Sequence, residues 1–125
     1  AAPDSLWVGT DNGLFVSRDA GKSFTRASQP GMEMCQGIAV DPKNSSRWFV
    51  AVAAPWWTSH KNIPGIYLTV DGGVNYRRLS DMPGEGMAWR LTLDPHDGNR
   101  IYVGTNGIGA WRAVIAENGS PDTAE

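Results

Sequence analysis

Ser17-Arg18-Asp19-Ala20-Gly21-Lys22-Ser23-Phe24 is the stretch that decides the fold of this chain, because its pattern returns at Thr69-Val70-Asp71-Gly72-Gly73-Val74-Asn75-Tyr76. Both stretches read hydroxyl residue, any residue, Asp, any residue, Gly, two residues, aromatic, and each follows a short apolar run. A carboxylate two residues before a glycine accepts backbone N–H bonds across a tight turn, and glycine adopts the positive φ that such a turn needs. The repetition therefore indicates two copies of one strand–turn–strand unit.

A second repeat has nearly the same period. The segment from Ala39 to Val50 recurs from Thr92 to Val103, and both copies contain Asp-Pro followed by Arg and an apolar run. Periods near 50 residues with four short strands each are typical of β-propeller blades. The sequence predicts an all-β fold of antiparallel four-stranded blades: strands two to four of one blade, all of the next, and two or three of another. These make about two and a half blades, an incomplete ring, since propellers close with roughly four to eight.

Short apolar runs between turn signals predict the strands, and no stretch shows helical periodicity. We assign residues 1–115 to the partial propeller and residues 116–125 to a polar C-terminal tail. The predicted strands are residues 6–10, 13–17, 23–27, 36–40, 47–53, 65–69, 75–79, 88–93, 100–105 and 109–114.

The repeated turn resembles the Asp box (BNR-type repeat) of sialidase-type and sortilin-type propellers, which also occurs in xyloglucanase-type glycoside hydrolases and photosystem-assembly propellers. The resemblance covers about Leu6 to Arg112 and suggests a C-terminal part of such a propeller. In those families the box joins the third and fourth strands of a blade, on the face away from the ligand. It implies a structural role, not a chemical one, for Ser17, Asp19, Gly21, Phe24, Thr69, Asp71, Gly73 and Tyr76. The second copy departs mildly, with Thr69, Asn75 and Tyr76 for the commoner Ser, Ser or Thr, and Trp.

A ligand face is expected where loops between strands two and three lie beside the loops that join blades. In the second unit these are residues 54–64 and 80–89, which are rich in tryptophan. Indole faces are platforms for sugar rings, methyl groups or a partner's side chains. The alternative is that the adjacent indoles fill a gap between blades or contact the rest of a ring. The predicted ligand residues are Trp56, Trp57, His60, Lys61, Trp89 and Arg90.

Catalytic and metal chemistry find little support in the sequence. Asp81 and Glu85 are weak candidates for the acid and base of a glycosidase, and loop carboxylates are more often solvated. His60 has no second histidine or cysteine near it, and each repeated turn supplies one carboxylate, so neither zinc nor calcium is expected. Cys35 is interpreted as a buried small hydrophobe. We expect no metal and no cofactor.

Net charge is −2, without a basic stripe, and no apolar run approaches the roughly 20 residues of a membrane helix. We therefore expect neither nucleic acid nor a membrane as partner. The opening Ala1-Ala2-Pro3 would fit the sequence after a signal cleavage site, which favours an extracytoplasmic location, periplasmic or secreted. Two functions remain open: a non-catalytic interaction or scaffold module that binds a protein or glycan, and, as the alternative, part of a glycoside hydrolase resembling xyloglucanases.

Two and a half blades leave two faces without a neighbour, so we expect association with the remainder of the propeller or with copies of the chain itself. The residues expected to be exposed in part on those faces are Leu14, Val16, Ile38, Val40, Phe49, Ile66, Leu68, Leu91 and Leu93.

Overall fold

The computed structural model describes residues 3–53, 63–79, 88–105, 109–116 and 123–124. These residues form strands and turns without a helix, so no described helix is long and apolar enough to cross a membrane. The strands are β1 (Leu6–Thr10), β2 (Gly13–Ser17), β3 (Thr25–Arg26), β4 (Cys35–Val40), β5 (Trp48–Val52), β6 (Gly65–Thr69), β7 (Arg77–Arg78), β8 (Ala88–Asp94), β9 (Asp97–Thr105), β10 (Ala110–Val114) and β11 (Thr123–Ala124).

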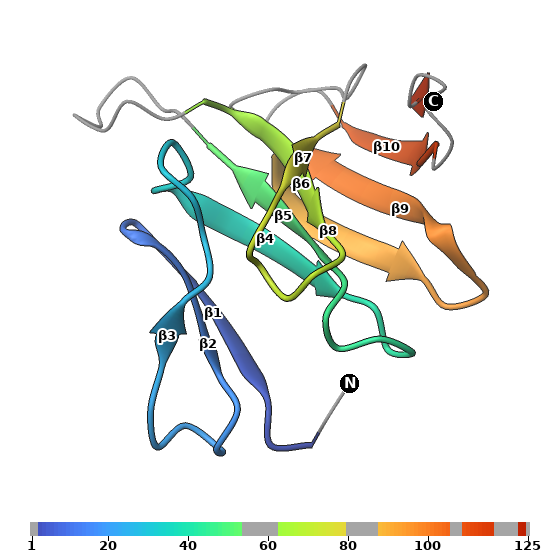
Figure 1. Ribbon diagram of the computed structural model, residues 1–125. Coiled ribbons are helices and arrows are strands. Elements are labelled where there is room, and N and C mark those ends of the chain that lie inside the picture. Colours follow the sequence, from blue (N-terminus) through green and yellow to red (C-terminus); the bar gives the residue numbers. More distant parts are fainter. Residues whose placement is uncertain (1–2, 54–62, 80–87, 106–108, 117–122, 125) are drawn as a thin grey trace.

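Three antiparallel sheets follow one another along the chain (Figure 1). The first sheet has three strands in the order β1-β2-β3, and the middle sheet has four in the order β4-β5-β6-β7. The last sheet has the order β8-β9-β10-β11. The predicted all-β blade architecture is confirmed, including the first sheet, which has three strands where each of the other two has four.

The predicted strand bounds are least accurate at the outer edge of each sheet. The return strands expected over 23–27 and 75–79 shorten to β3 and β7, with two residues each. Within the segment expected as a polar tail, β11 pairs with β10 through Val114 and Thr123 and through Ala113 and Ala124. An outer strand of two residues makes few ladder bonds, so apolar patterning gives little signal for it.

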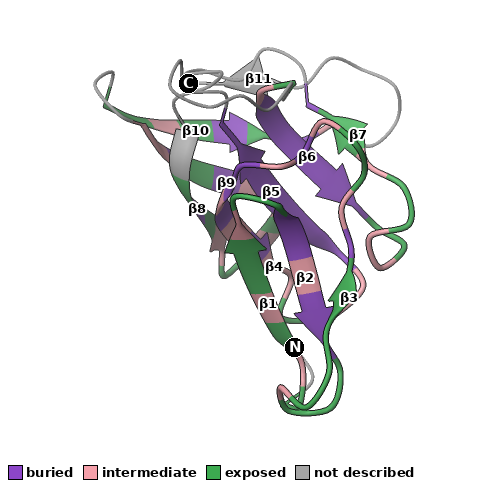
Figure 2. Ribbon diagram, turned by 90° about the vertical axis from the view of Figure 1, so that its left-hand side faces the viewer, coloured by how far each residue is buried: buried purple, intermediate pink, exposed green. Residues whose placement is uncertain are grey.

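Strand β5 supplies side chains to two separate cores, because successive residues of a strand point to opposite faces. Trp48, Val50 and Val52 pack toward the first sheet, in a cluster with Leu14 and others. Phe49 and Ala51 pack toward the last sheet, in a second cluster. All five residues of β5 are fully buried. Figure 2 shows the buried colour along β5, β6 and most of β2, whereas β1, β3 and β7 are mainly in the exposed and intermediate colours.

The expectation of exposed apolar end faces was wrong for most of the residues that it named. Leu14, Val16, Phe49, Ile66, Leu68 and Leu91 are buried, because they lie on faces that meet a neighbouring sheet within the chain. The residues that remain exposed are on the opposite faces of the two end sheets, among them Leu6, Val8 and Tyr102. The alternation of apolar residues in the sequence identified the apolar faces of the strands. It did not show which face of each sheet packs against a neighbouring sheet.

Candidate functional site

The first repeated turn is closed by its own side chains. The Ser17 hydroxyl donates to Asp19 Oδ1 at 2.8 Å and accepts the Gly21 N–H at 2.9 Å. Asp19 also accepts the Ser23 N–H at 2.8 Å and the Ser23 hydroxyl at 2.5 Å. Ser17 is fully buried at the end of β2. Both oxygens of the carboxylate are therefore occupied within the turn.

The second turn repeats these bonds. Thr69 donates to Asp71 Oδ1 at 2.8 Å and accepts the Gly73 N–H at 3.0 Å. Asp71 accepts the Asn75 N–H and the Asn75 side-chain amide, each at 2.9 Å. Gly21 has φ 89° and Gly73 has φ 90°, a left-handed conformation that favours glycine. Thr69 in the place of Ser17, and Asn75 in the place of Ser23, therefore preserve the hydrogen-bond geometry of the turn.

These bonds also set the charge of both carboxylates. The pKa of Asp19 falls to about 2, first through the Ser23 hydroxyl, and that of Asp71 also falls to about 2, first through the Asn75 backbone N–H. Hydrogen bonds to the charged form favour ionisation. Neither carboxylate holds a proton near neutral pH, so neither has the protonation state of a general acid.

The aromatic residue that ends the second turn connects two sheets. The Tyr76 hydroxyl donates to the Ala27 carbonyl oxygen at 2.5 Å and accepts the Trp48 Nε1–H at 3.0 Å. Burial raises the pKa of this phenol above its ordinary value. Phe24 holds the same position in the first turn and is exposed. The aromatic therefore packs against the preceding sheet where one is present.

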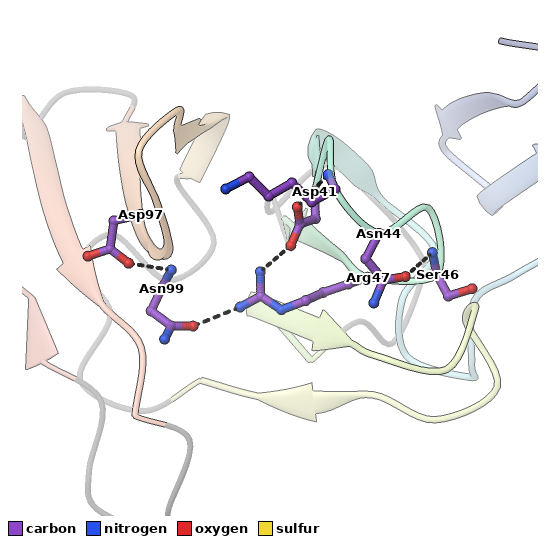
Figure 3. Close-up of polar contacts among 7 residues, drawn as sticks. Asp41, Asn44, Ser46, Arg47, Asp97 and Asn99 are labelled. Atoms are coloured by element: carbon purple, nitrogen blue, oxygen red, sulfur yellow. Dashed lines mark hydrogen bonds and ion pairs between the residues drawn. The ribbon is translucent and has the colours of Figure 1, made fainter. Parts of the chain in front are cut away.

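A polar cluster lies on the turn side of the middle sheet (Figure 3). Arg47 lies between two partners: its Nη1 contacts Asp41 Oδ2 at 3.1 Å, and its Nη2 donates to Asn99 Oδ1 at 3.0 Å. Arg47 also lies over the Phe49 ring. Asn99 belongs to β9 of the last sheet, so this guanidinium joins adjacent sheets. Arg47 thus bonds to both Asp41 and Asn99, which indicates a structural role.

The junction of the first and middle sheets has an arginine of its own. Arg18 donates to the Ser5 hydroxyl at 3.1 Å and to the Ser45 carbonyl oxygen at 3.3 Å. It therefore joins the first sheet to the β4–β5 turn, as Arg47 joins the middle sheet to β9. The sequence analysis used the Asp-Pro…Arg repeat only for its period, although the repeat also marks Asp41 and Arg47, which pair in the structure.

The side of the sheets opposite the repeated turns is here called the loop edge and is marked by Thr10, Val52, Gly65, Ala88 and Thr105. Strand pairing brings these five strand ends to one edge. The turns at 18–24, 41–47, 70–76 and 95–96 lie at the other edge, as predicted from the order of antiparallel strands. The loop edge is therefore where the long connections leave and re-enter the described part of the chain.

Most of the predicted site lies outside the described residues: Trp56, Trp57, His60, Lys61, Asp81 and Glu85. Trp89 is the extra residue of a β-bulge between Ala88 and Arg90, and its side chain also lies outside them. Gln36 holds the same bulge position in the middle sheet. Arg90 is exposed on β8, next to the loop edge.

Arg90 lies on the outward face of the last sheet, which the sequence reasoning did not identify. An open hollow of about 650 Å³ there is lined by Arg90, Thr92, Tyr102, Val103, Gly104, Ala110, Trp111 and Arg112. Guanidinium groups beside aromatic rings suit carboxylate or π-face contacts. This face is amphipathic and cationic, whereas the faces between sheets are apolar.

Metal and thiol chemistry have no site in the part of the chain that the structure describes. No group of three His, Cys, Asp or Glu residues there is placed to hold a metal ion. Cys35 is buried, as predicted, and its thiol contacts the Met32 carbonyl oxygen at 3.1 Å. Burial, followed by the charge of Glu33, raises the pKa of this thiol to about 12. A thiol with that pKa is not a nucleophile near neutral pH.

Comparison with known sequences finds similarity to parts of much longer proteins. The chain is 30% identical over 124 residues to a probable oligoxyloglucan-reducing end-specific xyloglucanase of Neosartorya fischeri, covering 94% of this chain and 14% of that protein. It is 40% identical over 47 residues to vacuolar protein sorting/targeting protein 10 of Chaetomium globosum, covering 38% of this chain and 3% of that protein. No family model matches the chain.

Solved structures show the same fold. An ancestral GH74 enzyme superposes with a TM-score of 0.73 at 18% identity, covering 98% of this chain and 17% of that one. The structure described as YCF48 bound to D1 peptide superposes with a TM-score of 0.61 at 16% identity, covering 96% and 36%. Together with the three packed antiparallel sheets, these neighbours define the chain as a partial, all-β β-propeller.

Proposed function

We propose that this chain is a non-catalytic scaffold and interaction part of an Asp-box β-propeller, with a protein or glycan bound at the loop edge. The observation that carries the proposal is the closure of both repeated turns. Asp19 and Asp71 have both carboxylate oxygens engaged by neighbours within the turn. The most characteristic acidic residues of the sequence therefore hold strands in place, and contact with a ligand is left to the other edge.

The ligand surface that we propose combines tryptophan and cationic residues: Trp56, Trp57, His60, Lys61, Trp89 and Arg90. Support comes from the return of the flanking strands to one edge and from the exposure of Arg90 there. Of the two ligand classes, the xyloglucanase name of the first relative favours a glycan. A tryptophan face can stack on a sugar ring, while the polar groups contact its hydroxyls. We also propose an extracytoplasmic location, since a polysaccharide-binding propeller would meet its polymer outside the cytoplasm.

The second candidate function is a part of a xyloglucan-acting glycoside hydrolase. It is favoured by 30% identity over 124 residues to a probable xyloglucanase. The chain spans only 14% of that relative, so the matched part alone need not hold the catalytic groups. Asp81 and Glu85 would be its acid and base, because glycosidases place two carboxyl groups on either side of the bond.

Two measurements on the purified chain with xyloglucan oligosaccharides separate the two functions. Calorimetric titration measures binding, and the release of reducing ends measures hydrolysis. Binding without hydrolysis supports the scaffold role, and hydrolysis that is lost in Asp81→Asn or Glu85→Gln supports the hydrolase. A double Trp56→Ala, Trp57→Ala variant should weaken binding at least 10-fold. Phe24→Ala, which removes an exposed aromatic at the turn edge, is the matched control. Unchanged binding in the double variant would reject the loop edge as the ligand surface.

A further inference from the structure

The outward face of the last sheet differs in chemistry from the faces between sheets. Leu91, Ile101 and Val103 point inward and are buried in the core that this sheet shares with the middle sheet. Because side chains alternate along a strand, Arg90 and Tyr102 lie on the outward face, where both are exposed. The strands of this sheet therefore place apolar residues on one side and polar or cationic residues on the other.

Strand pairing shows how far this face departs from its counterpart in the middle sheet. The middle sheet packs against the last sheet through apolar residues, among them Phe49, Ala51, Ile66 and Leu68. By the pairing registers, the residues at the same positions of the last sheet are Tyr102, Gly104, Ala110 and Arg112. An apolar surface packed on this face would take guanidinium groups out of water without a counter-charge, which costs free energy. An occupant of this face must therefore supply anionic groups.

The hollow of about 650 Å³ on this face has a small-residue floor between two cationic groups. Gly104 and Ala110 line it together with larger side chains. Arg90 belongs to β8 and Arg112 to β10, so the two arginines stand on opposite sides of β9. The usual strand spacing and rise put their Cα atoms about 12 Å apart, since pairing offsets Arg112 by two residues along β9. Arg, Tyr and Trp, which are all present in the lining, are the side chains most enriched at the energetic centres of protein interfaces.

The sheets at the two ends of a second copy do not supply matching anions. Strands β1, β2 and β3 contain no acidic residue, and the guanidinium of Arg26 lies over the Phe15 ring at 4.9 Å there. The acidic residues of the last sheet, Asp94 and Asp97, lie at its turn edge beside Arg100, at 3.9 and 4.0 Å. Packing of two last sheets would bring like charges together. The charge pattern of this face therefore fits a partner of different composition.

We propose that the outward face of the last sheet binds an acidic segment of another protein, in which two carboxylates flank an apolar side chain. The carboxylates pair with Arg90 and Arg112, and the apolar side chain packs over Gly104 between them. A guanidinium binds a carboxylate through two parallel N–H···O bonds, so the pairing is directional as well as charged. An extended peptide presents residues i, i+2 and i+4 on one side, with the outer two about 13 Å apart, close to the separation of the two arginines. Arg90 is shared with the loop edge, whereas Gly104 and Arg112 belong to this face alone.

Nuclear magnetic resonance of the isotope-labelled full chain tests this contact. The probe is an acetylated and amidated peptide with the core Glu-Ser-Leu-Ser-Glu, and the same peptide with Gln for both Glu residues is its control. We expect the acidic peptide to bind with a submillimolar Kd and to shift the backbone amide signals around Gly104 on β9 and Arg112 on β10. The Gln peptide and the Arg112→Gln variant should each weaken binding at least about 10-fold, because a charge-assisted pairing is lost.

Two further variants separate a specific site from general attraction between charges. Gly104→Val fills the hollow and keeps every charge, and its added Cβ meets Arg90 Cβ at 3.5 Å, an ordinary contact; it should weaken binding as much as Arg112→Gln does. Lys43→Gln removes an exposed cation at the turn edge and should leave the affinity unchanged. Equal losses in Lys43→Gln and Arg112→Gln overturn the proposal, as do shifts confined to the loop edge or no shifts at millimolar peptide. Tighter binding of trigalacturonate than of the peptide also overturns it, because an acidic glycan would then be the occupant.

Discussion

Removal of one hydroxyl, in the Tyr76→Phe variant, should weaken the junction of the first and middle sheets. The ring of Trp48 is fully buried, and its N–H would lose its acceptor. An unsatisfied buried donor costs about 1–3 kcal/mol. The Ala27 carbonyl oxygen would lose a donor as well, which adds about 0.5–1.5 kcal/mol. We expect the free energy of unfolding to fall by about 2–4 kcal/mol.

Urea denaturation followed by far-ultraviolet circular dichroism measures this change. Tyr102→Phe is the matched control, because its hydroxyl also donates one hydrogen bond, to Asp94 Oδ2 at 3.0 Å, but from an exposed residue. That variant should lose less than about 1 kcal/mol. Equal losses in the two variants, or a loss below about 1 kcal/mol for Tyr76→Phe, would refute the assignment of Tyr76 as a connection between sheets.

Three other outcomes are expected. Arg47→Met should lower the free energy of unfolding by about 2–4 kcal/mol, because it leaves the nearly buried carboxylate of Asp41 uncompensated. Arg100→Met, whose ion pairs are 3.9 and 4.0 Å long, should cost under about 1 kcal/mol. Similar costs for the two variants would contradict this. Gly73→Ala would place Cβ 2.8 Å from the Ala27 carbonyl oxygen, so it should lower the free energy of unfolding by about 2–5 kcal/mol in the same assay. Gly72→Ala should cost about 1–2 kcal/mol, because nothing lies within 4 Å of its added Cβ. The reverse order would be inconsistent with this packing. Asp71 has a pKa of about 2, below its ordinary 3.8, so the unfolded state binds more protons between these values. The stability that Asp71 contributes should be complete above about pH 5 and be lost as the pH falls toward 2. Acid denaturation of Asp71→Asn should therefore show a shallower fall.

The fold was predictable because its signal is local and repeated. Turn closure by Asp19 depends on residues within four positions of it, and these are visible as a pattern in the sequence. The Tyr76 connection could not be predicted in the same way, since its acceptor, Ala27, is 49 residues away. Nor could alternation show which face of β2 is covered, which is why the expected exposure of Leu14 was wrong.

The candidate site could be predicted only in part. The division into a turn edge and a loop edge follows from the order of antiparallel strands, and the structure has it. The cationic outward face of the last sheet was missed because Arg90 and Arg112 are distant in sequence and meet only through the pairing of β8, β9 and β10. The tryptophans and carboxylates of the long connections lie outside the described residues, so their roles stay predictions.

The spacing of equivalent residues records where this architecture tolerates a change of length. Between the first and middle sheets, β1 and β5 are offset by 42 residues, whereas β2 and β6 are offset by 52. The difference is absorbed wholly in the connection at the loop edge, and the pairing of strands on either side is unchanged. An added residue within β5 would instead exchange the sets of side chains that fill its two cores. New sequence, whether gained in evolution or grafted in the laboratory, can therefore enter at the loop edge without disturbing the packing of the sheets.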